Sequence, residues 1–62
     1  MLTEKEMNVV DMMHARGGSF VKALAECFYR ADMLNVIKLK QAFPEYWKEY
    51  EEMAEKNEQE GL

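Results

Sequence analysis

Residues 19–30 read SFVKALAECFYR, and this segment predicts the architecture of the chain more strongly than any other. Its charged residues, Lys22, Glu26 and Arg30, recur every four positions, so they occupy one narrow stripe of a helix. The remaining positions are almost all apolar or aromatic. We therefore expect a central helix that is buried over most of its surface, with Cys27 as a small core residue.

The segment before this helix carries signals for both of its ends. Thr3 followed by Glu6 is a capping-box pattern, which predicts a helix that begins near Glu4. Apolar residues then recur at helical spacing, and the helix is expected to end at Arg16. The glycine pair that follows predicts this end, and Ser19 is expected to cap the central helix.

A third helix is expected over residues 33–42, with Asp32 as its cap. The spacing of Met33, Val36 and Ile37 predicts that these three side chains face inward. Polar residues recur at every third position between them, and we expect these to face water.

The last helix is expected to begin at Pro44, because a proline costs nothing at the first helical position. Phe43 precedes it and is pushed out of the helical region. Apolar residues follow at helical spacing as far as Ala54. Residues 55–62 are polar and acidic, and we expect this tail to fray.

These segments predict an all-α fold, a compact bundle of three to four short helices in one domain over residues 1–54. The patterns leave open whether residues 20–43 form one helix or two.

A chain of 62 residues is expected to be only marginally stable as a monomer, because the free energy gained by hydrophobic burial nearly equals the cost of lost chain entropy. Cys27 is the only cysteine and His14 the only histidine, so neither a disulfide nor a structural zinc site is expected. We therefore expect homo-oligomerisation, most simply a dimer.

The expected location is the cytoplasm. Glu4, Lys5 and Glu6 stand where a secretory signal would carry a basic start and an apolar block. No apolar run approaches the roughly 18 residues that indicate a membrane span. A single unpaired cysteine is also typical of a reducing compartment.

An aromatic stripe on the last helix is the strongest candidate for a binding surface, since such residues are favoured at interfaces. We expect another protein as the partner, and residues 44–62 carry a net charge of −5, which suits a basic one. The predicted contact residues are Phe43, Tyr46, Trp47 and Tyr50, with Glu49 and Met53 beside them.

Two alternative binding sites remain open. The first is an anion site at a helix start, where an oligomeric sponge would hold a phosphorylated small molecule. It would use Arg16, Gly17, Gly18, Ser19 and Lys22. The second is a helix-turn-helix-like regulator that reads DNA with residues 33–42. It would use Asn35, Lys38, Lys40 and Gln41, although the net charge of −4 disfavours nucleic acid.

No pattern indicates catalysis. Cys27 and His14 fall on different helices, so a nucleophile and base are not brought together by the sequence. The carboxylates of the last helix are expected on its exposed side, where nothing raises their pKa. We therefore expect no enzymatic activity, no cofactor and no metal.

The segments GGSFVKALAECFYRAD and AFPEYWKEY, which lie between Gly17 and Tyr50, resemble small proteins encoded by bacteriophages and prophages. This resemblance implies two roles. One is an inhibitor or sponge directed at a host defence protein, and the other is a small regulator. It assigns no binding or catalytic residue.

Overall fold

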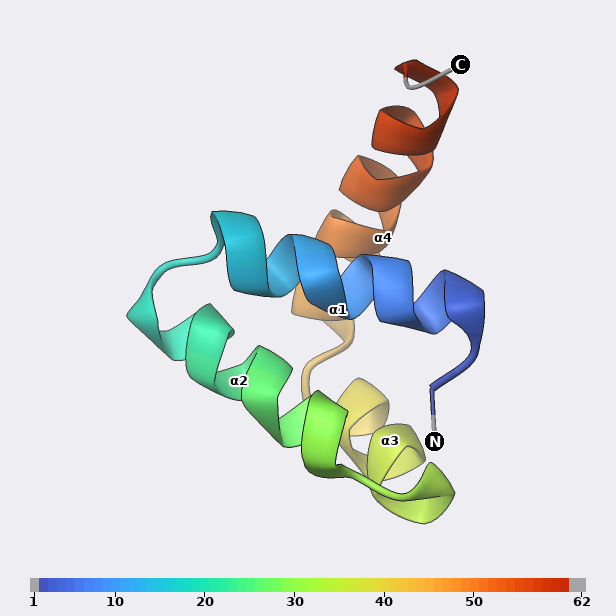
Figure 1. Cartoon of the computed structure of the whole chain (residues 1–62). Helices are drawn as coiled ribbons and strands as arrows, with labels where there is room; N and C mark the ends of the chain where they lie inside the picture. Colours follow the sequence, from blue (N-terminus) through green and yellow to red (C-terminus); the bar gives the residue numbers. More distant parts are fainter. Residues whose placement is uncertain (1, 61–62) are drawn as a thin grey trace.

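The computed structural model describes the backbone of residues 2–60 and the side chains of residues 2–57. Four helices account for nearly all of this range, which confirms the predicted all-α fold (Figure 1). They are α1 (Glu4–Arg16), α2 (Ser19–Arg30), α3 (Met33–Ala42) and α4 (Pro44–Glu60). The middle of the chain thus forms two helices. The Cα radius of gyration is 10.9 Å, close to the roughly 10.6 Å expected of a folded chain of this length.

The predicted start of α1 is confirmed in its details. The hydroxyl of Thr3 accepts from the backbone N–H of Glu6 at 3.1 Å, and the carboxylate of Glu6 accepts from the backbone N–H of Thr3 at 3.0 Å. This reciprocal capping box satisfies two of the N–H groups that a helix start leaves without partners.

The core forms where α1 and α2 pack against each other. The largest fully buried side chains are Val9, Val10 and Met13 of α1 and Phe28 of α2. Each contributes about 1.5–3 kcal/mol to folding through the hydrophobic effect. The α2 face that packs here consists of Val21, Leu24, Ala25 and Phe28. The spacing of these residues is helical, so one side of α2 enters the core.

The opposite side of α2 is exposed, and the expectation that this helix would be buried over most of its surface is wrong. Phe20 is 54% exposed, and Tyr29 is also exposed. Cys27 was expected in the core but is a free, exposed thiol. The reason is the small number of helices, because α1 covers one side of α2, α4 packs mainly on α1, and α3 meets α2 at only a few residues.

The turn between α1 and α2 does not need glycine for its backbone conformation, although the glycine pair suggested that it would. Gly17 has φ −74° and ψ 160°, so the turn does not use the left-handed conformation that favours glycine. A Cβ atom on Gly17 would lie 2.5 Å from Cγ1 of Val21 and 2.6 Å from the carbonyl oxygen of Met13. Gly17 is therefore required by the close approach of the two helices.

The predicted cap of α2 is wrong. Gly18, not Ser19, is the N-cap residue, and it makes no side-chain hydrogen bond. Ser19 is instead the first helical residue. The chain leaves α1 in an extended conformation for two residues, which places the start of α2 one position earlier than a serine cap would.

The start of α3 is confirmed, since the carboxylate of Asp32 accepts from the backbone N–H of Asn35 at 2.8 Å. Val36 is buried as predicted, but Met33 and Ile37 are exposed, which corrects their assignment to the core. α3 packs on its neighbours only near its middle and C-terminal end, so one apolar side remains uncovered.

α4 begins at Pro44 as predicted and lies across α1, where Tyr50 and Ala54 join the core. It does not end at Ala54 but continues to Glu60, and its second half extends past the other helices (Figure 1). Residues 55–60 contain neither glycine nor proline, and Glu52 and Lys56 have the favourable four-residue spacing. These features favour a helix over residues 55–60, so that fraying of this tail stays a prediction, and residues 61–62 of the tail lie outside the described residues. Among the described residues, no helix has the length and apolarity that crossing a membrane requires.

The two neighbouring glycines should respond differently to the same added methyl group. We expect Gly17→Ala to lower the free energy of unfolding by about 1–3 kcal/mol, because its Cβ must displace Val21 and a backbone carbonyl. The matched control is Gly18→Ala, where a Cβ meets nothing within 4 Å. Urea unfolding at neutral pH measures both, and equal losses for the two variants would contradict this role of Gly17.

Candidate functional site

The predicted aromatic stripe of α4 is divided between the core and the surface. Tyr50 is buried, and Trp47 is partly buried with its ring centroid 5.1 Å from that of Phe28. These two rings therefore hold α4 onto the bundle. Tyr46 remains exposed because it lies about 100° around the helix from Trp47.

An aromatic corner, which we define as Phe20, Phe43 and Tyr46, joins the start of α2 to the start of α4. The ring centroids of Phe20 and Phe43 are 5.7 Å apart in an edge-to-face arrangement, and those of Phe20 and Tyr46 are 5.8 Å apart. Phe43 and Tyr46 are separated by 6.2 Å. Sequence reasoning placed Phe20 in the core, so its part in this corner was missed.

Beside the aromatic corner lies an acidic hollow of about 310 Å³. It is lined by Ala42, Phe43, Glu45, Tyr46 and Glu49. Three of these, Phe43, Tyr46 and Glu49, belong to the predicted partner-binding set. Glu45 was missed as a site residue because the sequence explained it as a favourable charge in the first helical turn.

Met53, the remaining member of the predicted partner-binding set, lies at a different hollow between α1 and α4. This hollow has a volume of about 220 Å³. It is lined by Met12, Arg16, Met53, Lys56 and Asn57. The predicted set is thus spread over the core and two separate surfaces.

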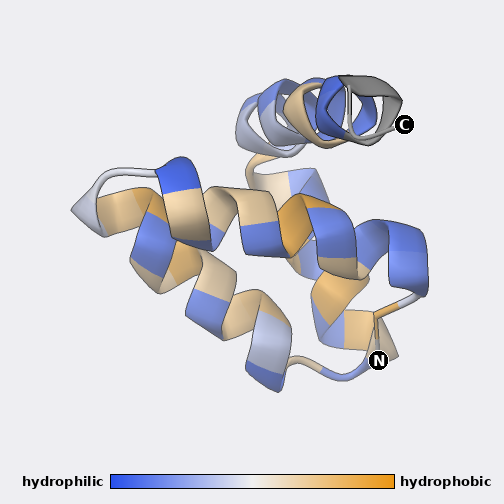
Figure 2. Cartoon of the chain, turned by 45° about the horizontal axis from the view of Figure 1, so that its top comes forward, coloured by the Kyte–Doolittle hydropathy of each residue, from blue (hydrophilic) through white to orange (hydrophobic). Residues whose placement is uncertain are grey.

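The two most exposed large apolar side chains of the described residues, Met33 and Leu34, are on α3, and Ile37 of the same helix is also exposed. Met33 is 68% exposed, Leu34 69% and Ile37 47%. Their spacing places all three on one side of the helix, and we call them the α3 apolar stripe. Figure 2 shows the hydrophobic colouring of α3 near the N-terminus, in contrast to the mostly hydrophilic α4. Sequence reasoning missed this surface because the same spacing also predicts a core-facing side.

A further shallow hollow of about 370 Å³ lies where the N-terminus meets the α2–α3 turn. Tyr29 is one of its lining residues, and its hydroxyl donates to the carboxylate of Asp11 on α1. Partial burial raises the pKa of Tyr29 to about 12, with the hydrogen bond to Asp11 and the charge of that carboxylate adding to the effect. This hydrogen bond joins α1 to α2. Burial and this bond together account for the raised pKa of Tyr29, so the shift does not indicate a catalytic residue.

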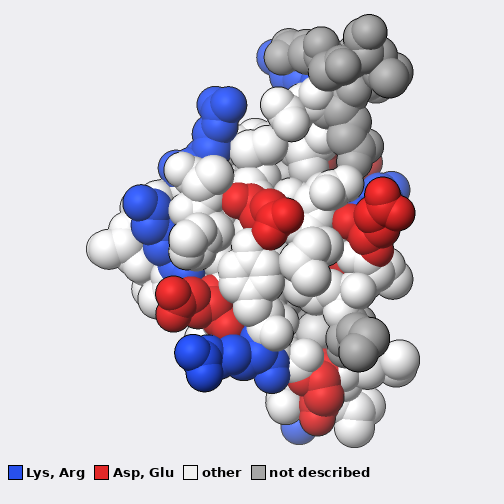
Figure 3. All heavy atoms as spheres, viewed as in Figure 1, with Lys and Arg blue, Asp and Glu red and all other residues white. Residues whose placement is uncertain are grey.

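The residues of the predicted anion site lie at the end of α1, in the turn and at the start of α2. Gly17 is buried, whereas Gly18, Ser19 and Lys22 are exposed around the first turn of α2. Arg16 lines the hollow between α1 and α4, together with Lys56. Figure 3 shows several basic side chains along the left edge of the molecule in that view, spaced apart from one another.

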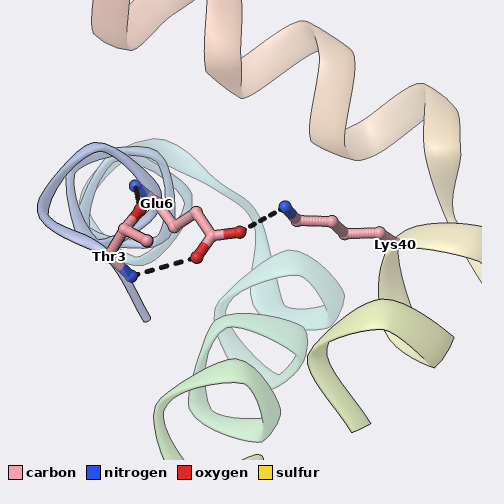
Figure 4. A network of polar contacts seen from close by, with 3 residues as sticks. All are labelled: Thr3, Glu6 and Lys40. Carbon is pink, nitrogen blue, oxygen red and sulfur yellow. Dashed lines mark hydrogen bonds and ion pairs between the residues drawn. The ribbon is translucent and has the colours of Figure 1, made fainter. Parts of the chain in front are cut away.

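The predicted nucleic-acid residues are also separated by the fold. Asn35, Lys38 and Gln41 are exposed, but Lys40 is turned toward α1. Its ammonium group donates to the carboxylate of Glu6 (Figure 4). The same group lies 4.4 Å from the ring centroid of Trp47. Lys40 therefore holds α1, α3 and α4 together and is not available to a phosphate.

This contact changes the acidity of Glu6. The hydrogen bond from Lys40 holds the pKa of Glu6 below its ordinary value of 4.5, and the backbone N–H of Thr3 acts in the same direction. The side chains of Lys40 and Glu6 are only 32% and 22% exposed, so water screens the pair less than it screens a surface ion pair.

No group of three or more histidine, cysteine, aspartate or glutamate side chains in the described part of the chain is placed to hold a metal ion. No protein-family model matches the chain, and neither a curated protein nor a solved structure shows significant similarity to it. The resemblance to phage-encoded proteins therefore stays a prediction.

Replacing Lys40 by methionine removes the ion pair with Glu6, and we expect the resulting loss in the free energy of unfolding to depend on pH. A lowered carboxyl pKa stabilises the fold above the unfolded-state pKa and stops doing so as the pH falls through the folded-state pKa. We expect Lys40→Met to cost about 1 kcal/mol of unfolding free energy at pH 7. This deficit should shrink once the pH falls below 4.5.

Urea unfolding of both proteins near pH 7 and again near about pH 3 measures this difference. The matched control is Lys5→Met, because Lys5 lies 3.9 Å from Glu55 with both side chains largely exposed, and we expect it to change little. A deficit of the same size at both pH values would contradict the role assigned to Glu6.

Proposed function

We propose that this protein is a small, non-enzymatic protein-interaction module and that α3 presents its apolar stripe to a partner protein. The observation that carries the proposal is the exposure of Met33, Leu34 and Ile37 on one side of a single helix. Exposed single hydrophobic residues are ordinary, whereas a contiguous apolar patch marks a contact surface.

The size of this patch supports a protein partner. At roughly 200 Å² for a large side chain, the exposed parts of the three residues amount to about 350–400 Å². This lies within the range of about 300–600 Å² of the largest patch on a typical monomer, which is often functional. A stable interface covers about 800 Å² per partner, of which roughly 450–520 Å² is apolar. The stripe supplies most of that apolar share.

The mode of contact that suits this surface is insertion of a helix into a groove, where residues at one-turn spacing act as anchors. Lys38 and Gln41 flank the stripe and provide a polar rim. A second copy of the chain is the simplest partner, because two identical stripes can pack across a twofold axis. This homodimer would also supply the stability that so small a core lacks.

The DNA-binding alternative has less support. A recognition helix needs exposed cations and hydrogen-bonding groups toward the groove. α3 does expose Asn35, Lys38 and Gln41, but its apolar stripe lies beside them and Lys40 is paired with Glu6. The sponge alternative rests on the turn at Gly17 and Gly18, and it has less support because Arg16 lines the separate hollow between α1 and α4. A cytoplasmic location remains part of the proposal, since the exposed thiol of Cys27 suits a reducing compartment.

Self-association is tested by sedimentation equilibrium at micromolar concentrations. We expect a mass above the 7.3 kDa of one chain, and we expect the double variant Met33→Gln, Leu34→Gln to remain at 7.3 kDa. Glutamine has a helix propensity close to those of methionine and leucine, so α3 should stay folded. The matched control is Lys22→Gln, Glu26→Gln, which changes two exposed residues of α2 and should still associate.

A different protein as the partner is tested with the same variants. The wild-type chain and the control pair are expected to capture a protein from lysate that the Met33, Leu34 double variant does not capture. A wild-type chain that stays monomeric and captures nothing beyond what the double variant captures would contradict the proposed function.

A further inference from the structure

We propose that the acidic hollow at the start of α4 binds an arginine side chain from a basic segment of a partner protein. This site is separate from the α3 apolar stripe and does not depend on its role. The proposal names the chemical group that this surface would recognise, which is a guanidinium group.

Aromatic rings form the first part of the site. Phe43 and Tyr46 line the hollow, and Phe20 packs against both of them. Since Tyr46 and Phe20 remain exposed, ring surface is accessible to a ligand. The face of an aromatic ring carries negative charge density and attracts cations, with Arg used more often than Lys.

Two carboxylates form the second part. Glu45 and Glu49 are one turn apart on α4, so both lie on the side that lines the hollow. Both are exposed, and neither makes an ion pair with any side chain between residues 2 and 57. This contrasts with Glu6 and Glu55, which have lysine partners. The hollow thus offers uncompensated negative charge beside exposed rings.

The charge of the surrounding helix has the same sign. Residues 44–62 carry seven acidic and two basic residues, whereas residues 17–43 have a net charge of +2. A basic partner would be steered toward α4, because complementary charge raises the rate of encounter. The start of α4 is where this negative charge meets the aromatic corner.

The volume of the hollow limits the size of the ligand. At about 310 Å³ it lies at the lower end of the roughly 300–1,000 Å³ of sites that hold small molecules. One long side chain of a partner therefore fits better than a larger free ligand. Arginine suits the site better than lysine, since a planar guanidinium stacks on a ring while its fork of N–H groups meets a carboxylate.

The test uses the full chain, labelled with ¹⁵N, and short capped glycine peptides with arginine, lysine or citrulline at the centre. Citrulline has the shape of arginine without its charge. At low ionic strength we expect saturable shifts of backbone amides around residues 42–49 with the arginine peptide. The lysine peptide should bind more weakly, and the citrulline peptide should produce no saturable shift.

Two variants locate the site. Glu45→Gln, Glu49→Gln should weaken binding of the arginine peptide by about tenfold, and Tyr46→Leu by about fivefold. The matched control is Glu4→Gln, Glu26→Gln, which removes the same charge from α1 and α2 and should leave the affinity within about twofold. Because Glu45 and Glu49 are exposed, their variant is expected to fold even if Tyr46→Leu does not.

Three results would overturn the proposal. The first is equal weakening by the control pair, which would show attraction to net charge alone. The second is equal affinity for the lysine or citrulline peptide. The third is a change in the assembly mass of the Glu45, Glu49 variant without peptide, which would assign the hollow to a second copy of the chain.

Discussion

The packing of Phe28 between α1 and α4 is the contact on which the rest of the structure depends. Phe28 is almost completely buried beside Val9, Val10 and Met13, and its ring meets that of Trp47. Three helices thus share one side chain. The close approach of α1 and α2 that this requires is possible because Gly17 has no Cβ atom.

This arrangement leaves too little chain to cover every apolar surface. α1, α2 and α4 surround the core, and α3 contributes only Val36 as a buried residue. The outer side of α3 and the start of α2 therefore remain exposed although the molecule is as compact as its length allows. Both proposed binding surfaces exist because the chain is too small to cover all of its apolar side chains. One is the α3 apolar stripe, and the other is the acidic hollow beside the aromatic corner that contains Phe20.

The ends of the helices could be predicted because they depend on local chemistry. The Thr3 and Glu6 capping box, the Asp32 cap and the proline at residue 44 each act within a single turn. The cap of α2 was misassigned, since Gly18 and Ser19 are adjacent and both suit that position. Local patterns therefore predicted where each helix begins to within about one residue, whereas the end of α4 lies at Glu60 and not at Ala54.

The sides of the helices that face the core could not be predicted in the same way. Met33 and Ile37 have the spacing of core residues, but their burial depends on where α3 lies relative to α1 and α4. Of the candidate binding residues, Tyr46 and Glu49 are exposed, whereas Tyr50 belongs to the core. The contact of Lys40 with Glu6 joins residues far apart in the sequence, so no local pattern predicts it.

The central claim is that the α3 apolar stripe lies outside a core built around Phe28. Methyl NMR with a neutral, water-soluble paramagnetic probe tests it most directly, because relaxation increases with exposure to the probe. In protein diluted until sedimentation gives the 7.3 kDa mass of one chain, we expect strong broadening of the methyl signals of Met33, Leu34 and Ile37 and little change in those of Val10 and Met13. Equal protection of both groups would contradict it.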